Sequence, residues 1–184
     1  MLQPDDIAAF LAGQPHVAHP FKTLGMLGIE DCWVGAGLLR NAVWDHLHGL
    51  RLGPVPGSDV DVVYCNPADV NPATDLSIQN CLCTMAPGVP WSVHNQARMH
   101  GANGDPPYRN VADAIRCWPE TATAVAARLW HGRLEVLAPH GLQDLVDLIV
   151  RPTSAFASKI AAYRSRQASK RWKERWPKLT FVSV

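Results

Sequence analysis

The sequence lacks any long apolar run: no uninterrupted stretch approaches the roughly 20 residues that a membrane-spanning helix needs. It also lacks a basic N-terminal region. The first residues, MLQPDDIAAFLAG, carry two aspartates where a secretory signal peptide would carry lysine or arginine. We therefore expect a cytoplasmic protein that does not associate with a membrane.

Cysteine is sparse, and its count of five is odd, so the cysteines cannot all pair with one another. Most of them lie in apolar surroundings, which indicates reduced, buried thiols rather than a disulfide framework. Cys81 and Cys83 form a C-x-C pair, but the sequence nearby offers no two further ligands at zinc-site spacing. The pattern disfavours both a disulfide-stapled protein and a structural zinc site.

The chain does contain enough apolar sequence for one substantial core, because its 184 residues are 47% hydrophobic and 18% charged. No internal repeat or domain-sized linker interrupts it, so we expect a single domain over residues 1–184. Its charge is uneven. Residues 159–184 hold eight Lys and Arg against one acid, a net charge of +7, whereas the rest holds nine against fifteen, a net charge of −6. Such a tail suits a phosphate-bearing nucleotide or RNA, although a solvated helix face is the simpler interpretation.

Hydrophobic periodicity and turn residues predict the order of the elements. We expect strands at 32–34, 59–65 and from Trp91, and a hairpin about His131-Gly132, with helices at 3–14, after Pro20, and at 38–47, 73–86, 111–118, 119–129 and 141–150, and a basic C-terminal helix at about 154–176. The fold class is therefore mixed α/β (α+β), with a small mixed sheet of about four to five strands flanked by helices.

The stretch GSDVDVVYCNP places Asp59 and Asp61 one residue apart at the start of an apolar strand. Side chains at alternate strand positions point to the same face, so the two carboxylates repel each other. Either they are solvated turn residues or they hold a cation. A carboxylate pair beside a phosphate site suits Mg²⁺, which takes one or two carboxylates plus phosphate oxygens and water.

A phosphate site is indicated just upstream, where the strand in WVGAG opens directly into the helix LLRNAVWDHL. Free backbone N–H groups at such a helix start bind anions, and glycine permits their close approach. The order of glycine turn, helix, loop and D-x-D strand contains neither a P-loop nor the G-x-G-x-x-G of a dinucleotide site.

This order resembles the nucleotidyltransferase superfamily related to DNA polymerase β, in which a glycine turn precedes D-x-D. More closely, the chain is similar to a bacterial family of nucleotidyltransferase-like proteins once catalogued as a domain of unknown function. The matching runs span roughly Asp31 to Leu179 and include DCWVGAGLLRNAVWDHLHG, SDVDVVYCNP, WSVHNQARMH, WPETATAVAARL, EVLAPHGLQDL and KRWKERWPKL. The resemblance implies a nucleotidyltransferase-like fold.

The resemblance also implies an activity: Mg²⁺-dependent (or Mn²⁺-dependent) transfer of a nucleoside monophosphate from an NTP to an acceptor hydroxyl. Asp59 and Asp61 would be the catalytic, metal-binding carboxylates, and Gly35 and Ala36 would hold the triphosphate. A third carboxylate is expected on a neighbouring strand, where this chain has Ser92. The alternative is therefore a catalytically weak or inactive nucleotide-binding module on the same fold.

The sequence departs from the family pattern at further positions. The superfamily's turn often has a serine where this chain has Ala36, the spacer from Gly35 to Asp59 is longer, and His94 stands where the closer family has a lysine. Glu135, in an apolar strand, is a second candidate for the missing carboxylate, but it reads equally well as an exposed strand residue.

Further polar residues are candidates for nucleotide binding. Arg40 and Asn41, early in the helix after the glycine turn, suit phosphate or ribose contacts and suit helix capping equally. Asn95 and Arg98 belong to a polar cluster after the Trp91 strand, and we expect them to bind the nucleotide. The acceptor is unidentified, whether small molecule or macromolecule, and RNA is a possible but less favoured partner.

Overall fold

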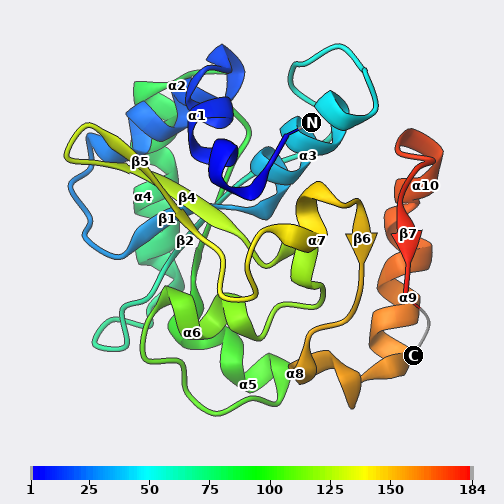
Figure 1. The fold of residues 1–184 in the computed structure, drawn as a ribbon. Coiled ribbons are helices and arrows are strands. Elements are labelled where there is room, and N and C mark those ends of the chain that lie inside the picture. Colours follow the sequence, from blue (N-terminus) through cyan, green and yellow to red (C-terminus); the bar gives the residue numbers. More distant parts are fainter. Residues whose placement is uncertain (1, 183–184) are drawn as a thin grey trace.

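The computed structural model describes residues 2–182 and contains a five-stranded sheet of the order β3-β2-β1-β4-β5 (Figure 1). The strands are β1 (Cys32–Gly35), β2 (Val60–Tyr64), β3 (Trp91–Asn95), β4 (Ala126–Trp130) and β5 (Arg133–Leu137). β2 and β3 run parallel, and the other neighbours run antiparallel. The expected small mixed sheet flanked by helices is confirmed.

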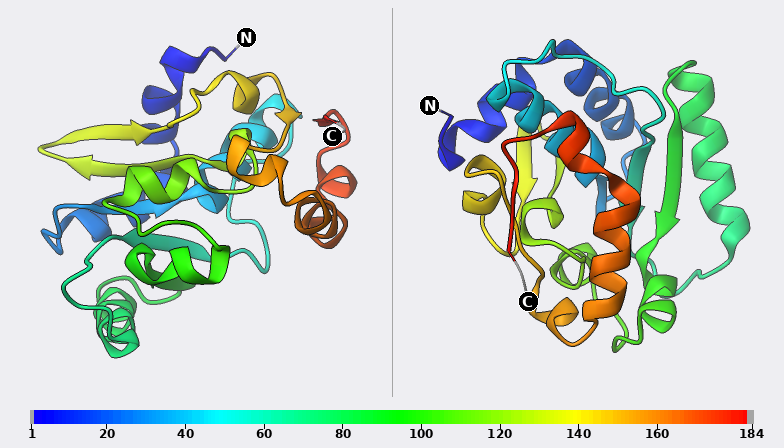
Figure 2. Two further views of the ribbon diagram at one scale, coloured as in Figure 1. Left: turned by 90° about the horizontal axis from the view of Figure 1, so that it is seen from below. Right: turned by 90° about the vertical axis from the view of Figure 1, so that its right-hand side faces the viewer.

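Helices cover both faces and the ends of this sheet (Figure 2). The α-helices are α1 (Ile7–Ala12), α2 (Pro15–Gly25), α3 (Ala36–Leu47), α4 (Pro72–Met85), α5 (Met99–Asn103), α6 (Val111–Arg116), α7 (Gln143–Val146), α8 (Ser154–Ala157), α9 (Ile160–Lys170) and α10 (Trp172–Arg175). Short 3-10 turns are η1 (Pro4–Asp6), η2 (Gln96–Arg98) and η3 (Thr121–Thr123), and a small parallel pair joins β6 (Ile149–Val150) to β7 (Thr180–Phe181). No helix within residues 2–182 is long and apolar enough to cross a membrane.

The hairpin expected about His131-Gly132 is confirmed, and it joins β4 to β5. His131 and Gly132 both have positive φ, 46° and 75°. Two consecutive residues with positive φ match the twist of a tight antiparallel hairpin, which explains the choice of glycine at the second position.

A cluster of three tryptophans attaches the C-terminal segment to the body of the protein. Trp44 of α3 is fully buried, and the rings of Trp172 and Trp176 meet it edge-on, with centroids 5.5 and 5.2 Å away. Edge-to-face pairs of this kind add to the free energy gained from burying the rings. The two C-terminal tryptophans therefore fix the basic tail beside α3.

The basic helix expected over about 154–176 was wrong as one continuous element, because the chain divides it into α8, α9 and α10. Between α9 and α10, Arg171 has a left-handed backbone with φ 49°. This turn redirects the chain so that Trp172 and Trp176 can both contact Trp44. Packing of the tryptophans overrides the helical periodicity of the tail.

The helices expected over 119–129 and 141–150 were also wrong in part. Residues 121–123 form η3, and the chain then enters β4, where Ala126 and Ala127 are fully buried beside β1. The second helix ends at Val146, and Ile149 and Val150 form β6 instead. Alanine-rich sequence favours a helix, but a fully buried position between two strands outweighs that weak local preference.

Candidate functional site

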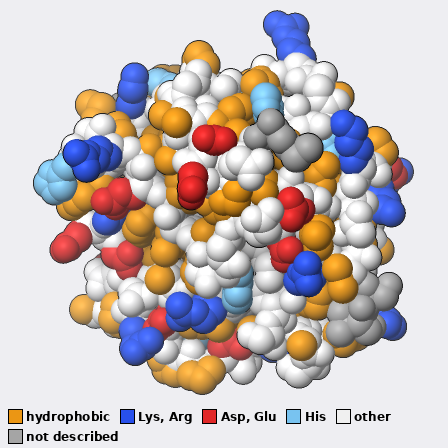
Figure 3. Space-filling model, viewed as in Figure 1, with side chains coloured by type: hydrophobic (Ala, Val, Ile, Leu, Met, Phe, Trp, Pro, Cys, Tyr) orange, Lys and Arg blue, Asp and Glu red, His pale blue; other side chains and the backbone are white. Residues whose placement is uncertain are grey.

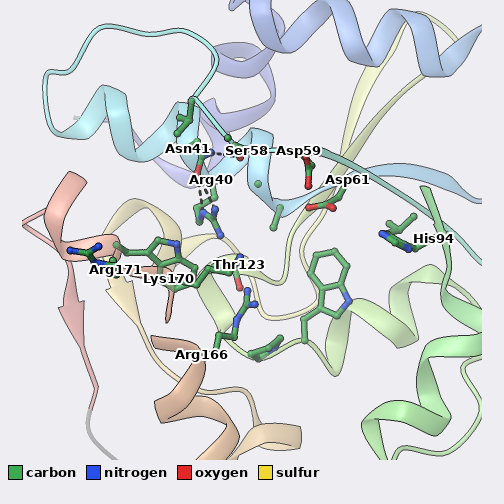
Figure 4. A pocket seen from close by; sticks show the side chains of 18 of the residues that line it. Arg40, Asn41, Ser58, Asp59, Asp61, His94, Thr123, Arg166, Lys170 and Arg171 are labelled. Atoms are coloured by element: carbon green, nitrogen blue, oxygen red, sulfur yellow. Dashed lines mark hydrogen bonds between the residues drawn. The ribbon is translucent and has the colours of Figure 1, made fainter. Parts of the chain in front are cut away.

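A cavity of about 700 Å³ opens where β1 meets α3 and where β2 begins (Figure 4). Its lining comes from five regions: the start of α3, the D-x-D segment with the loop before it, β3 with the segment that follows it, residues 117–123, and the C-terminal helices. Among the lining residues are Ala36, Gly37, Arg40, Asn41, Ser58, Asp59, Asp61, His94, Trp118, Arg166, Lys170 and Arg171. The fold therefore gathers residues 36–61 and 166–171 around one space.

Asp59 and Asp61 lie on one wall of the cavity. Asp59 immediately precedes β2, and Asp61 is its second residue, while the alternate residues Val60 and Val62 are buried in the core. Burial raises the pKa of Asp61, and the Asp59 carboxylate acts in the same direction, whereas His94, Arg40 and Lys170 act against it. Neither carboxylate has a hydrogen-bond donor within the described part of the chain.

Asp59 and Asp61 fit a hard divalent cation whose remaining coordination positions are filled by other ligands. Asp59 and Asp61 offer carboxylate oxygens, and residues 2–182 contain no group of three or more His, Cys, Asp or Glu side chains that could hold a metal alone. Mg²⁺ typically takes one or two carboxylates and fills its remaining positions with water and phosphate oxygens. Ligand carboxylates must be ionised, so the raised pKa of Asp61 would make the affinity for such a cation fall as the solution is acidified.

β3 places Ser92 directly beside Asp61 in the parallel ladder. The Ser92 hydroxyl lies 2.8 Å from Nε2 of His94, and His94 lines the cavity. The other candidate carboxylate, Glu135, lies on β5, three strands from β2, and accepts a hydrogen bond from Arg128. The strand next to Asp61 therefore supplies a hydroxyl and an imidazole where the resemblance implies an acid.

The glycine turn brings the start of α3 against the D-x-D carboxylates. Gly35 is the N-cap of α3 and provides no side-chain cap for its first amides. A Cβ on Gly37 would stand 3.7 Å from Oδ2 of Asp61, and one on Gly35 would stand 3.5 Å from Cβ of Asp61. Backbone amides and the positive end of the helix dipole thus lie close to the carboxylate pair. This arrangement suits a phosphate group that a metal ion links to the two carboxylates.

Gly35 also has a packing constraint that yields a test. A Cβ at this position would approach Cη2 of the Trp118 ring to 3.0 Å. We expect Gly35→Ala to destabilise the fold by about 1–3 kcal/mol through overpacking, measured by chemical denaturation. Gly101→Ala, at a helical position where nothing lies within 4 Å of the added Cβ, is the matched control. Equal denaturation midpoints for wild type and Gly35→Ala would contradict this packing.

The opposite wall is basic and partly buried. Arg40 is 8% exposed, and its guanidinium lies 5.4 Å from the Trp44 ring centroid and 4.8 Å from that of Trp172. It donates to Oδ1 of Asn41, whose amide donates to Ser58. Burial lowers the pKa of Arg40 to about 10, and the charge of Arg166 acts in the same direction. Arg40 remains a cation at neutral pH, so it is a costly charge to bury.

Arg166 and Lys170 of α9 complete this basic cluster, which comprises Arg40, Arg166 and Lys170. Nε of Arg166 donates to the fully buried Glu120 at 2.9 Å, whereas Lys170 forms no ion pair with any residue of the described range. Burial lowers the pKa of Lys170, and the neighbouring Arg166 and Arg40 add to that effect. Of these three cations, Arg166 alone has an ion-pair partner among residues 2–182, and Figure 4 shows all three across the cavity from Asp59 and Asp61.

Three of the six residues predicted to bind nucleotide do not line this cavity, namely Gly35, Asn95 and Arg98. The Asn95 side chain is buried and bonds to the backbone of Asn66 and Asp69. Arg98 forms an ion pair with Asp75 of α4. The other three do converge: Ala36, Arg40 and Asn41 line the cavity, and Gly35 directly precedes Ala36 as the N-cap of α3. Sequence reasoning did not single out Arg166, Lys170 or Trp118, and the charge of the tail was the one signal for the first two.

Comparisons with known proteins identify the family and the fold. A family model described as "Nucleotidyltransferase" matches residues 22–181. A solved structure described as revealing "a CCA-adding enzyme head domain" is 27% identical, with a TM-score of 0.83, and the match covers 98% of this chain and 96% of that one. No curated protein matches.

Two larger enzymes share the fold at lower identity. The Thermotoga maritima CCA-adding enzyme complexed with tRNA is 16% identical with a TM-score of 0.60, and a CCA-adding enzyme in complex with ATP is 16% identical with a TM-score of 0.59. The matches cover 97% and 96% of this chain, which spans 42% of the length of each enzyme.

Proposed function

Because the chain belongs to a family of nucleotidyltransferases, we propose that it transfers a nucleoside monophosphate from an NTP to the hydroxyl of an acceptor. The hydroxyl oxygen forms a bond to the α-phosphorus, the bond between that phosphorus and the β-phosphate oxygen breaks, and pyrophosphate leaves. The hydroxyl proton passes to solvent. The observation that carries the proposal is one cavity with a carboxylate pair on one wall and, on the other, a group of cations that includes Arg40, Arg166 and Lys170.

The two walls suit different parts of a nucleoside triphosphate. Asp59 and Asp61 would hold Mg²⁺ (or Mn²⁺), which when bound neutralises phosphate charge. The amides that follow Gly35, beginning with Ala36, would donate to phosphate oxygens. Arg40, Arg166 and Lys170 face the same space and would hold the β- and γ-phosphates, with Asn41 orienting Arg40. Asn95 and Arg98 receive no ligand role, since they lie off the cavity.

Lys170 gives this assignment a direct test. We expect Lys170→Met to weaken ATP binding about 10- to 100-fold, the range of one charge-assisted hydrogen bond of about 1.5–3 kcal/mol, and to change AMP binding little. Isothermal titration with each nucleotide measures both. Lys178→Met is the control, because Lys178 donates to the backbone of Leu47 and does not line the cavity. Equal losses for ATP and AMP would place Lys170 away from the terminal phosphates.

A second candidate function is nucleotide binding without transfer, and Ser92 favours it because no acid stands beside Asp61 on β3. The two functions differ in turnover. Purified protein with Mg²⁺, each of the four NTPs and a panel of hydroxyl acceptors should release pyrophosphate if it is a transferase. Binding of NTP without acceptor-dependent pyrophosphate release would establish the binding module instead.

A further inference from the structure

A second, smaller cavity of about 200 Å³ adjoins the first. Its walls come from α2, α3, the loop before β2 and the loop before β3. Four residues line both cavities: Asn41, Val55, Ser58 and Asp59. Figure 4 shows Asn41, Ser58 and Asp59 in sequence along the edge of the larger cavity. The two spaces therefore meet at one of the carboxylates to which we assign the metal.

The lining of the small cavity differs in charge from that of the large one. Its side chains are mainly apolar, with Leu38, Val89 and Pro90 among them, and its polar groups include the imidazoles of His16 and His19. No Lys or Arg is among its described lining residues, and its one carboxylate is that of Asp59. Apart from Asp59, which the proposed function assigns to the metal, these walls offer a phosphate group no lysine or arginine, so the small cavity suits an uncharged ligand.

The volume of the small cavity limits the ligand further. An apolar cavity of roughly 150 Å³ holds a benzene molecule, so about 200 Å³ accommodates one ring with a few substituents. A nucleoside triphosphate needs far more room and has it in the larger cavity of about 700 Å³. The chemistry of the two spaces thus separates a large anionic ligand from a small neutral one.

We propose that the small cavity is the acceptor site, and that the acceptor is an uncharged, single-ring molecule bearing a hydroxyl. The ring would lie against Leu38 and Val89, and its hydroxyl would point to Asp59, where the two cavities meet. This inference rests on the proposed function, because the hydroxyl oxygen is the atom that bonds to the α-phosphorus of the NTP. It names the acceptor as a small molecule rather than a nucleic acid or protein.

The two histidines give the cavity hydrogen-bonding groups for ring substituents. His16 is half-buried, and burial lowers its pKa while the carboxylate of Asp45 opposes that shift. A neutral imidazole both donates and accepts hydrogen bonds, which suits hydroxyl groups. His19, one turn along α2, is exposed and lines the same space.

Phenol is the probe for this site, because it is neutral, has one ring and carries one hydroxyl. Titration of the full chain with phenol, without nucleotide, should shift the imidazole NMR signals of His16 and His19, and phenyl phosphate should not. Val89→Trp fills the cavity and should weaken phenol binding at least about tenfold. Pro87→Trp adds the same ring to the same loop at an exposed position outside the lining, and should bind phenol like wild type.

Each outcome decides the proposal. Absence of phenol-induced shifts, or equal phenol binding by wild type and Val89→Trp, overturns it whatever the protein does with ATP. If Val89→Trp does not fold, Pro54→Trp replaces it, because Pro54 is an exposed residue of the cavity wall. Adenosine that shifts the same imidazole signals and is displaced by phenol would assign the cavity to the donor's base and overturn the acceptor assignment. Phenol binding without any ATP binding would refute the proposed function and leave a neutral-ligand site.

Discussion

Replacing Asp61 by Asn is expected to lower ATP-dependent pyrophosphate release about 100- to 1,000-fold, the loss seen when one preorganised electrostatic contact is removed from an active site. The amide keeps the shape of the side chain and removes its charge, so Asp59 is left as the one carboxylate of the pair. Initial rates at saturating Mg²⁺ and ATP, with a responsive acceptor, measure the effect.

The same substitution should leave the fold intact or make it slightly more stable. Burial raises the pKa of Asp61, so its ionised form is less favourable in the folded than in the unfolded chain. This loss of folding free energy is absent at a pH below the ordinary aspartate pKa and is complete at a pH above the raised pKa of folded Asp61. The uncharged Asn side chain removes it at neutral pH. Asp147→Asn, at an exposed residue of the surface, is the control. Undiminished pyrophosphate release by a folded Asp61→Asn protein would locate the chemistry elsewhere.

Glu120→Gln is expected to have the largest effect on stability, about 3–5 kcal/mol, as for the loss of one partner from a buried ion pair. Glu120 is fully buried and accepts hydrogen bonds from Arg166 at 2.9 Å and from Thr123 at 2.6 Å. The substitution removes the charge of Glu120, so the basic cluster of Arg40, Arg166 and Lys170 loses its buried counter-ion. Urea denaturation at low ionic strength measures the loss.

Glu135→Gln is the matched control for this prediction, because Glu135 also pairs with an arginine but its side chain is 43% exposed. An exposed pair contributes only about 0–1 kcal/mol. Added pyrophosphate should restore part of the stability of Glu120→Gln, because a ligand that binds the folded state alone stabilises it by mass action. Equal stability of the two variants, or no stabilisation of Glu120→Gln by pyrophosphate, would contradict an excess of positive charge in the basic cluster.

Local patterns predicted the parts of the fold and of the site that depend on neighbouring residues. Alternation around Asp59 and Asp61 places them on one face of β2, and a strand that ends at Gly35 opens directly into α3. Positive φ at His131 and Gly132 follows from the turn chemistry of a hairpin. In each case the residues that indicate the local structure lie within a few positions of one another in the sequence.

Long-range packing decided the rest. Arg166 and Lys170 reach Arg40 only because Arg171 turns the chain and the C-terminal tryptophans dock on Trp44. Asn95 ends β3, the strand next to β2, and Arg98 lies just after it, yet Asp75 of α4 and the loop after β2 occupy their polar groups. Periodicity and spacing carry no information about which distant partner satisfies a polar side chain.

Above all, we propose that the carboxylate pair and the basic cluster form one triphosphate site that a metal completes. Isothermal titration with a non-hydrolysable ATP analogue, with and without Mg²⁺, tests it on wild type and Asp61→Asn together. We predict that Mg²⁺ strengthens binding of the analogue to wild type at least about tenfold, or about 1.4 kcal/mol, and does not change its binding to Asp61→Asn. The same Mg²⁺ effect in both proteins, or no binding to wild type at all, would contradict it.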